Sequence, residues 1–183
     1  MRKFFRLLTV LAVIQFLVAH PASADISIRQ SNEQLTAGSD VIVIGRAVER
    51  STRWIDRTLV TAVTVEVSES LKGSVSGRIE VVLPGGADAN RRIPVAMSFP
   101  GAPQMQANEE MFLFLTYDGD VNGYIVSGFA QGKFSIVTQQ GRRMISRDLR
   151  GSQLVEGTGV SRGTVTLTPL ADFRDEIAGY ISR

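Results

Sequence analysis

The chain contains no cysteine, and its only histidine, His20, lies near the N-terminus. Disulfide bonds are therefore impossible, and any product that begins after His20 has neither a thiol nor an imidazole. Such a product cannot use Ser-His-Asp or Cys-His nucleophilic catalysis. It also cannot bind a metal through imidazole or thiolate ligands. We therefore expect a non-enzymatic protein without a cofactor.

Residues 1–24 have the three parts of a secretory signal peptide. Three basic residues open the segment, an apolar stretch follows at 7–19, and Ala22-Ser23-Ala24 offers a cleavage site. The apolar stretch is shorter than the ~20 residues that a membrane-spanning helix needs. The sequence predicts cleavage before Asp25, no integral membrane segment afterwards, and a single domain at 25–183. The protein is expected to be extracytoplasmic, in the periplasm or secreted.

The charge balance argues against a nucleic-acid partner. The chain has 20 basic and 18 acidic side chains, and three of the basic ones lie in the predicted leader. Residues 25–183 therefore carry 17 − 18 = −1, whereas nucleic-acid binding depends on neutralising several phosphates. We expect a protein or a component of the cell envelope as the partner.

Short segments rich in β-branched residues follow one another from residue 40 onward. Residues 40–50 and 58–68 are predicted to form two antiparallel strands, with a bulge at Gly45, and residues 110–117 are apolar on both faces. Further strands are predicted at 78–83, 92–99, 123–129, 133–138, 142–147 and 163–168.

Two helices are predicted to flank these strands. Ser31 and Gln34 have the spacing of a capping box and predict a short N-terminal helix. A C-terminal amphipathic helix is predicted at about 169–182, with Thr168 as its cap and Pro169 in its first turn. Together the segments predict a mainly β protein, a small closed or partly closed antiparallel barrel with one helix covering an open side.

The segment from Asp118 to Gly123 matches the first half of a calcium-binding loop. Asp118, Asp120 and Asn122 supply oxygen atoms at alternate positions, as such a loop requires. However, Phe129 stands where the loop needs a bidentate glutamate. The same residue types also suit a tight turn between two strands, because they tolerate positive φ angles. The missing glutamate favours the turn over the calcium site.

Only two lysines lie outside the leader, Lys72 and Lys133, and both have serines nearby in the sequence, including Ser70 and Ser135. A Ser/Lys hydrolase would need one of these lysines buried and neutral as a general base. A lysine at a strand end with its ammonium in water is the commoner arrangement. Adjacent carboxylates, as at 109–110, point to opposite faces of a strand and do not suggest acid/base catalysis.

A proline- and glycine-rich segment at 84–110 interrupts the strands. Long loops on a rigid barrel commonly carry recognition surfaces. We expect this segment to contribute the contact surface, with binding residues Trp54, Arg91, Arg92, Phe99 and Lys133. A second group of arginines at 142–162 suggests either an anion-binding patch or a solvated glycine-rich hairpin. The near-neutral net charge favours the hairpin.

Four sequence segments carry a family resemblance: Asp40-Val-Ile-Val-Ile-Gly-Arg46, Ser70-Leu-Lys-Gly73, Glu109-Glu-Met-Phe-Leu-Phe-Leu115 and Ala130-Gln-Gly-Lys-Phe134. Their succession is similar to a group of secreted bacterial proteins. More distantly, over about residues 40–134, it resembles the netrin-like module of the tissue inhibitors of metalloproteinases. The resemblance implies a five-stranded OB-type barrel in which 41–50 and 59–68 form a long hairpin.

The resemblance does not imply that this chain inhibits proteases in the same way. Those inhibitors coordinate the protease zinc through an N-terminal cysteine held in a disulfide, whereas the predicted first residue here is Asp25. Our first hypothesis is therefore an exported binding module of unknown ligand. The alternatives are an inhibitor or accessory factor of a secreted metalloprotease, and a hydrolase that uses Ser/Lys or carboxylates.

Overall fold

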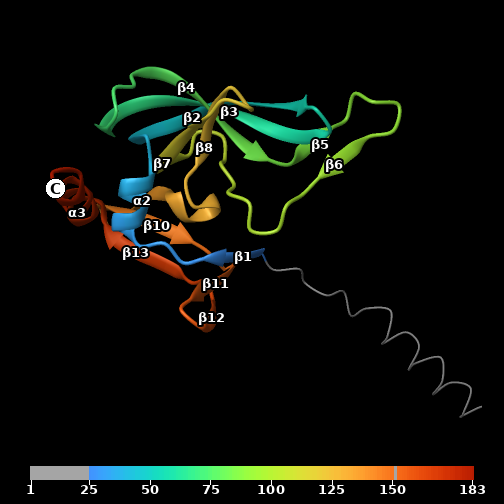
Figure 1. The fold of residues 1–183 in the computed structure, drawn as a ribbon. Helices are drawn as coiled ribbons and strands as arrows, with labels where there is room; N and C mark the ends of the chain where they lie inside the picture. The colour runs from blue at the N-terminus through green and yellow to red at the C-terminus, as the bar shows by residue number, and fades with distance from the viewer. Residues whose placement is uncertain (1–24, 151) are drawn as a thin grey trace, which may run out of the picture.

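The computed structural model describes residues 25–150 and 152–183, and the predicted signal peptide lies outside them. The fold is a β-barrel with a second layer of strands and helices beside it (Figure 1). The main sheet contains β2 (Val41–Ile55), β3 (Thr58–Lys72), β4 (Gly77–Pro84), β7 (Glu110–Asp118), β8 (Gly123–Val126), β9 (Lys133–Gln139), β10 (Arg142–Asp148) and β13 (Val165–Pro169).

The remaining elements lie around this sheet. They are β1 (Asp25–Ile28), α2 (Asn32–Gly38), β5 (Gly86–Asp88), β6 (Val95–Met97), the 3-10 helix η1 (Phe129–Gly132), β11 (Ser152–Glu156), β12 (Gly159–Arg162) and α3 (Leu170–Ile181). Within the described residues, no helix has the length and apolar character to cross a membrane.

Five strands close the barrel in the order β2-β3-β4-β8-β7, and β7 pairs back with β2. All neighbours are antiparallel except β4 and β8, which meet in parallel at Val81 and Tyr124. This order, with the third and fifth barrel strands adjacent and parallel, is that of an OB-type barrel. The predicted small mainly β barrel is therefore confirmed, with one parallel pair in place of a wholly antiparallel sheet.

The β2–β3 hairpin has two strands of 15 residues each, and its register shifts between Ile44 and Gly45. A Cβ atom at Gly45 would lie 2.6 Å from Val65 Cγ1 and 2.8 Å from the Glu66 carbonyl oxygen. Only glycine lets the two strands approach this closely. The predicted bulge at Gly45 is thus present, and it bends the hairpin into the barrel wall.

Strand β7 is apolar on both faces because it separates two hydrophobic cores. Met111, Leu113 and Leu115 point into the barrel, while Phe112 and Phe114 point toward the helices. All five side chains are fully buried. One edge of β7 pairs with β2, and the other is shared by β9 and β8. The second layer is therefore built directly onto the barrel wall.

The helices occupy nearly their predicted positions. Ser31 accepts from the Gln34 backbone N–H, and the Gln34 side chain accepts from the Ser31 backbone N–H, which completes the predicted capping box of α2. Helix α3 packs on the sheet through Leu170, Phe173 and Ile177. Its N-cap is Pro169 and not Thr168, and both residues still pair with β10 in the sheet.

For residues 142–162 the sequence favoured a solvated glycine-rich hairpin, and this is wrong in part. Strand β10 belongs to the main sheet, while β11 and β12 form a three-stranded sheet with β1, and Leu154 is buried. Strand β1 pairs in parallel with β11, where Asp25 lies opposite Ser152. Within the segment at 84–110, the strand predicted at 92–99 is present in shorter form as β6, which pairs with β5 on a projecting arm (Figure 1), and Met105 enters the barrel core.

Candidate ligand-binding cleft

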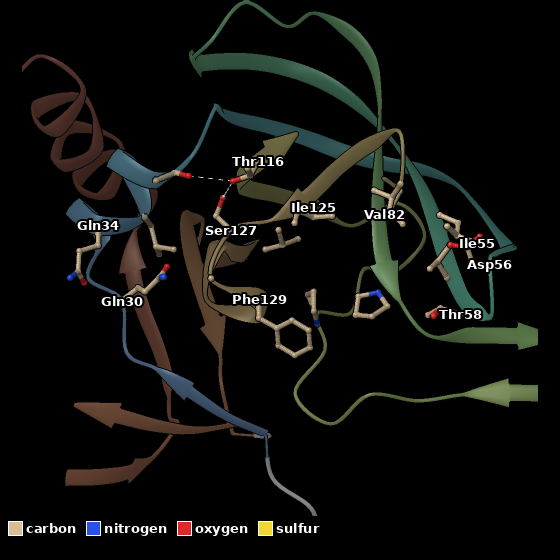
Figure 2. Close-up of a pocket in the computed structure, with 18 residues that line it drawn as sticks. Gln30, Gln34, Ile55, Asp56, Thr58, Val82, Thr116, Ile125, Ser127 and Phe129 are labelled. Carbon is tan, nitrogen blue, oxygen red and sulfur yellow. Dashed lines mark hydrogen bonds between the residues drawn. The ribbon is translucent and has the colours of Figure 1, made fainter. Parts of the chain in front are cut away.

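An apolar cleft of about 640 Å³ opens beside the barrel (Figure 2). Gln30 and Gln34 lie at one end, next to α2, and Ile55 and Thr58 lie at the other. Between them its wall is mainly aliphatic, with Val60, Val82, Pro84, Pro103, Val121, Ile125 and Val126. A concave, mostly apolar site with a few polar groups is the usual form of a small-molecule site.

The position of the cleft follows from the barrel topology. Ile55, Asp56 and Thr58 come from the connection between the first two barrel strands, β2 and β3. Val121 comes from the connection between the last two, β7 and β8. In OB-type barrels these two connections carry the ligand site. The cleft therefore lies where this architecture commonly binds its ligands, although its lining here is aliphatic.

The hydroxyl groups near the α2 end of the cleft are partnered with one another. Ser127 Oγ lies 2.9 Å from Thr116 Oγ1 and 2.9 Å from Ser39 Oγ. Ser39 also donates to the Leu35 carbonyl oxygen, and Thr116 donates to that of Gly38. Because these groups satisfy one another, they leave the apolar character of the cleft largely intact.

Phe129 lines the cleft with its backbone in the left-handed region, at φ 61°. A bulky residue rarely adopts this conformation, which costs about 1–2 kcal/mol outside glycine. The following turn is fixed by Gln131, whose buried side chain accepts from Gln30 N and donates to the Ile28 carbonyl oxygen. Backbone strain held in place by surrounding contacts is a common feature of binding sites.

We expect Phe129→Gly to be more stable than Phe129→Ala by about 1 kcal/mol, because both remove the ring and only glycine relieves the positive φ. Urea unfolding of the two variants measures the difference. At Ile125, in strand β8, the same pair of substitutions should give the opposite order. If Phe129→Ala proved as stable as Phe129→Gly, the positive φ at residue 129 would not be a source of strain.

A second, polar cavity of about 700 Å³ is lined by residues of the 101–109 segment and of strands β9 and β10. Lys133 Nζ donates to Glu109 Oε1 at 2.5 Å and to Ser135 Oγ at 2.9 Å, and Ser135 Oγ donates to Glu109 Oε1 at 2.5 Å. Lys133 and Glu109 are each only 15% exposed. Burial raises the pKa of Glu109, but hydrogen bonds from Lys133, Ser135 and the Gln106 N–H outweigh it, so its pKa is lowered.

Both sequence-based interpretations of the lysines need correction. Lys133 is not in open water, because Glu109 folds back from the preceding loop to meet it. Lys72 donates to the carbonyl oxygens of Thr36 and Ala37 at the C-terminal end of α2. It therefore caps a helix. Glu110, for its part, pairs with Arg143.

The segment from Asp118 to Asn122 forms the turn between β7 and β8. Asp118 Oδ1 accepts from the Asp120 N–H, Asn122 Oδ1 accepts from the Tyr117 hydroxyl, and Asn122 has φ 50°. Two of the three candidate calcium ligands thus serve the turn itself. In the part of the chain that the structure describes, no group of three or more Asp, Glu, His or Cys residues is placed to hold a metal ion.

The predicted binding residues do not form one surface. Trp54 lies in strand β2, opposite Leu59. Its Nε1 donates to Asp88 Oδ2 at 2.8 Å, and the Arg91 guanidinium lies 4.3 Å from its ring centroid. This contact fixes the β5–β6 arm to the hairpin. Arg92 and Phe99 are exposed on the same arm. Lys133 lies apart from them, in the polar cavity.

The arginines at 142–162 do not form one patch either. Arg143 pairs with Glu110 and Arg150 pairs with Asp148, while Arg142 and Arg162 are exposed on different sheets. Arg147 is partly buried over the ring of Phe134.

Sequence reasoning missed the lining of the apolar cleft because its residues come from many separate elements. No protein-family model, curated protein or solved structure matches the chain. The geometry of the cleft is therefore the main indication of function.

Proposed function

We propose that the protein is an exported, non-enzymatic binding module whose ligand site is the apolar cleft. The observation that carries this proposal is an open cleft of about 640 Å³ with aliphatic walls at the two barrel connections. An apolar ligand would gain about 25 cal/mol for each Å² removed from water. The segment at 84–110, which is expected to take part in recognition, contributes Pro84 and Pro103 to the wall of the cleft.

A Ser/Lys hydrolase fits the geometry less well. Lys133 Nζ and Ser135 Oγ do lie within hydrogen-bonding distance, but Glu109 contacts both of them. In a Ser/Lys dyad the serine hydroxyl must donate to the lysine, whereas here Ser135 Oγ donates to Glu109 and accepts from Lys133. The contacts of Glu109 instead suit a polar cluster that holds the 101–109 segment in place.

Inhibition of a metalloprotease in the netrin-like manner also fits less well. That mode needs a free N-terminal segment that enters the active site of the protease. Residues 25–28 instead form the ladder of β1 with β11, and Arg29 N donates to the Val155 carbonyl oxygen.

Binding of a neutral apolar dye, N-phenylnaphthylamine, tests the proposed site. We expect saturable fluorescence enhancement with the wild-type protein and at least tenfold weaker binding by Ile125→Glu, because the variant places a charge in the apolar wall. Ile93→Glu is the matched control, since Ile93 is 74% exposed and lies outside the cleft. Equal binding by the wild type and the Ile125 variant would refute the assignment.

A further inference from the structure

Strand β13 is an unprotected edge of the main sheet. It pairs with β10 and with no other strand of the described residues, and it lies on the outside of the second layer (Figure 1). The Leu149 N–H donates to the Thr164 carbonyl oxygen. Successive residues of an antiparallel strand turn their backbone groups to alternate sides, so Val165 and Leu167 turn theirs away from β10. The edge therefore offers N–H and C=O groups to a further strand.

The side chains along this edge are apolar and exposed. Val165 is 48% exposed and Leu167 is 46% exposed. Leu167 lies opposite Ser146, so both residues are on the face of the sheet away from the core that contains Ile145 and α3. The strand has no charged residue and no proline before its last position. Lysine, proline and bulges are the usual protection of an edge strand, and an edge without them is a template for strand addition.

The edge is complementary to itself. Residues 164–168 read Thr-Val-Thr-Leu-Thr, which is nearly the same in both directions. Two copies that pair antiparallel about a twofold axis through Thr166 bring Val165 of each copy opposite Leu167 of the other. Because both residues turn their backbone groups outward, each of these two pairs can exchange two N–H···O=C bonds. The outer threonines also lie opposite each other, and cross-strand threonine pairs stabilise neighbouring strands.

The charges beside the edge suit the same arrangement. In this register Arg162 of one copy lies opposite Leu170 of the other, at the start of α3, and the first turn of α3 carries Asp172. Arg162 and Asp172 are both exposed, and neither forms an ion pair within residues 25–150 and 152–183. The basic end of each edge therefore comes next to an acidic helix start of the other copy. This complementarity favours a second copy over an unrelated extended segment.

We infer that β13 is an interface between two copies of this chain, which pair along this edge into a symmetric dimer with one continuous sheet. The inference goes beyond the proposed function and does not depend on it, because no residue of β13 lines the apolar cleft. A standard interface has ~20–30 residues on each side, and this edge contributes far fewer. We therefore expect a reversible dimer with a dissociation constant of about 10–100 μM.

Sedimentation equilibrium of the full protein from about 1 to about 300 μM tests the inference. We expect the mass to rise from that of one chain toward that of two. Val165→Lys/Leu167→Lys should weaken association about tenfold, because each lysine then lies opposite a lysine of the other copy. Val165→Lys/Leu167→Glu should restore association, because the same register then places a lysine opposite a glutamate. Val137→Lys/Gln139→Lys, at exposed positions on β9, is the matched control and should associate like the wild type.

Three outcomes would overturn the inference. The mass of a single chain at every concentration would exclude the dimer. Equal association of the wild type and the double-lysine variant of β13 would exclude this edge as the interface. If the lysine/glutamate variant failed to restore association, the twofold register about Thr166 would be wrong. Each variant should keep the far-ultraviolet circular dichroism and the dye binding of the wild type, which separates loss of the interface from loss of the fold.

Discussion

Replacing Phe173 by alanine is expected to remove about 3–5 kcal/mol from the free energy of unfolding. The ring is 3% exposed, and its centroid lies 4.8 Å from that of Phe134 and 5.1 Å from that of Phe112. It is the main aromatic contact by which α3 covers the second core. Since domains are stable by only about 5–15 kcal/mol, the loss would be a large part of the total.

Urea unfolding followed by far-ultraviolet circular dichroism measures this loss as a shift of the midpoint at unchanged slope. Phe99→Ala is the matched control, because Phe99 is 40% exposed, and we expect it to cost less than about 1 kcal/mol. A cost below about 1 kcal/mol for Phe173→Ala would mean that α3 is not packed on the sheet in solution.

The second large effect is expected at Lys133. Lys133→Met removes the cation but keeps the length of the side chain, and it leaves the Glu109 carboxylate largely buried without its ammonium partner. We expect the free energy of unfolding to fall by about 3 kcal/mol at neutral pH, which is the lower end of the range for breaking a buried ion pair. The double variant Glu109→Gln/Lys133→Met should lose less, because no uncompensated charge remains.

The effect of Lys133→Met should depend on pH. In the wild type the pKa of Glu109 is lowered, so its contribution to stability is present above the ordinary glutamate pKa and is lost as pH falls through the folded value. In the variant, burial acts on Glu109 without the Lys133 hydrogen bond. The difference in free energy of unfolding between the wild type and the variant should therefore become smaller as the pH is lowered from about 7 to below about 4.3. A difference that stays constant over this range would contradict the role of the ion pair between Lys133 and Glu109.

The barrel and its helices were predictable from the sequence because their signals are local. Period-two alternation marks β3, the capping box marks α2, and the spacing of Leu170, Phe173 and Ile177 marks α3. Residues 110–117 were seen to be apolar on both faces. Only the structure shows why, since β7 is the strand common to both cores.

The polar and binding features were not predictable because they depend on contacts between distant segments. In the sequence, Lys133 has the pattern of a solvated lysine at a strand end. In the structure, the loop that carries Glu109 folds back and brings its carboxylate onto this lysine. The strain at Phe129 has no counterpart in the residue pattern, which placed that residue at the end of a strand. Strands β11 and β12 are short and mostly polar, so their local signal is weak.

Strand β1 has a consequence for the order in which the chain acquires its structure. Asp25 pairs with Ser152, which lies 152 − 25 = 127 positions later. During synthesis, β1 is the first part of this domain to be made. Its partner strand β11 exists only after nearly all of the rest of the domain has been made. Contacts of such long range slow folding. The earliest piece of the domain to be synthesised is thus among the last to be locked into place.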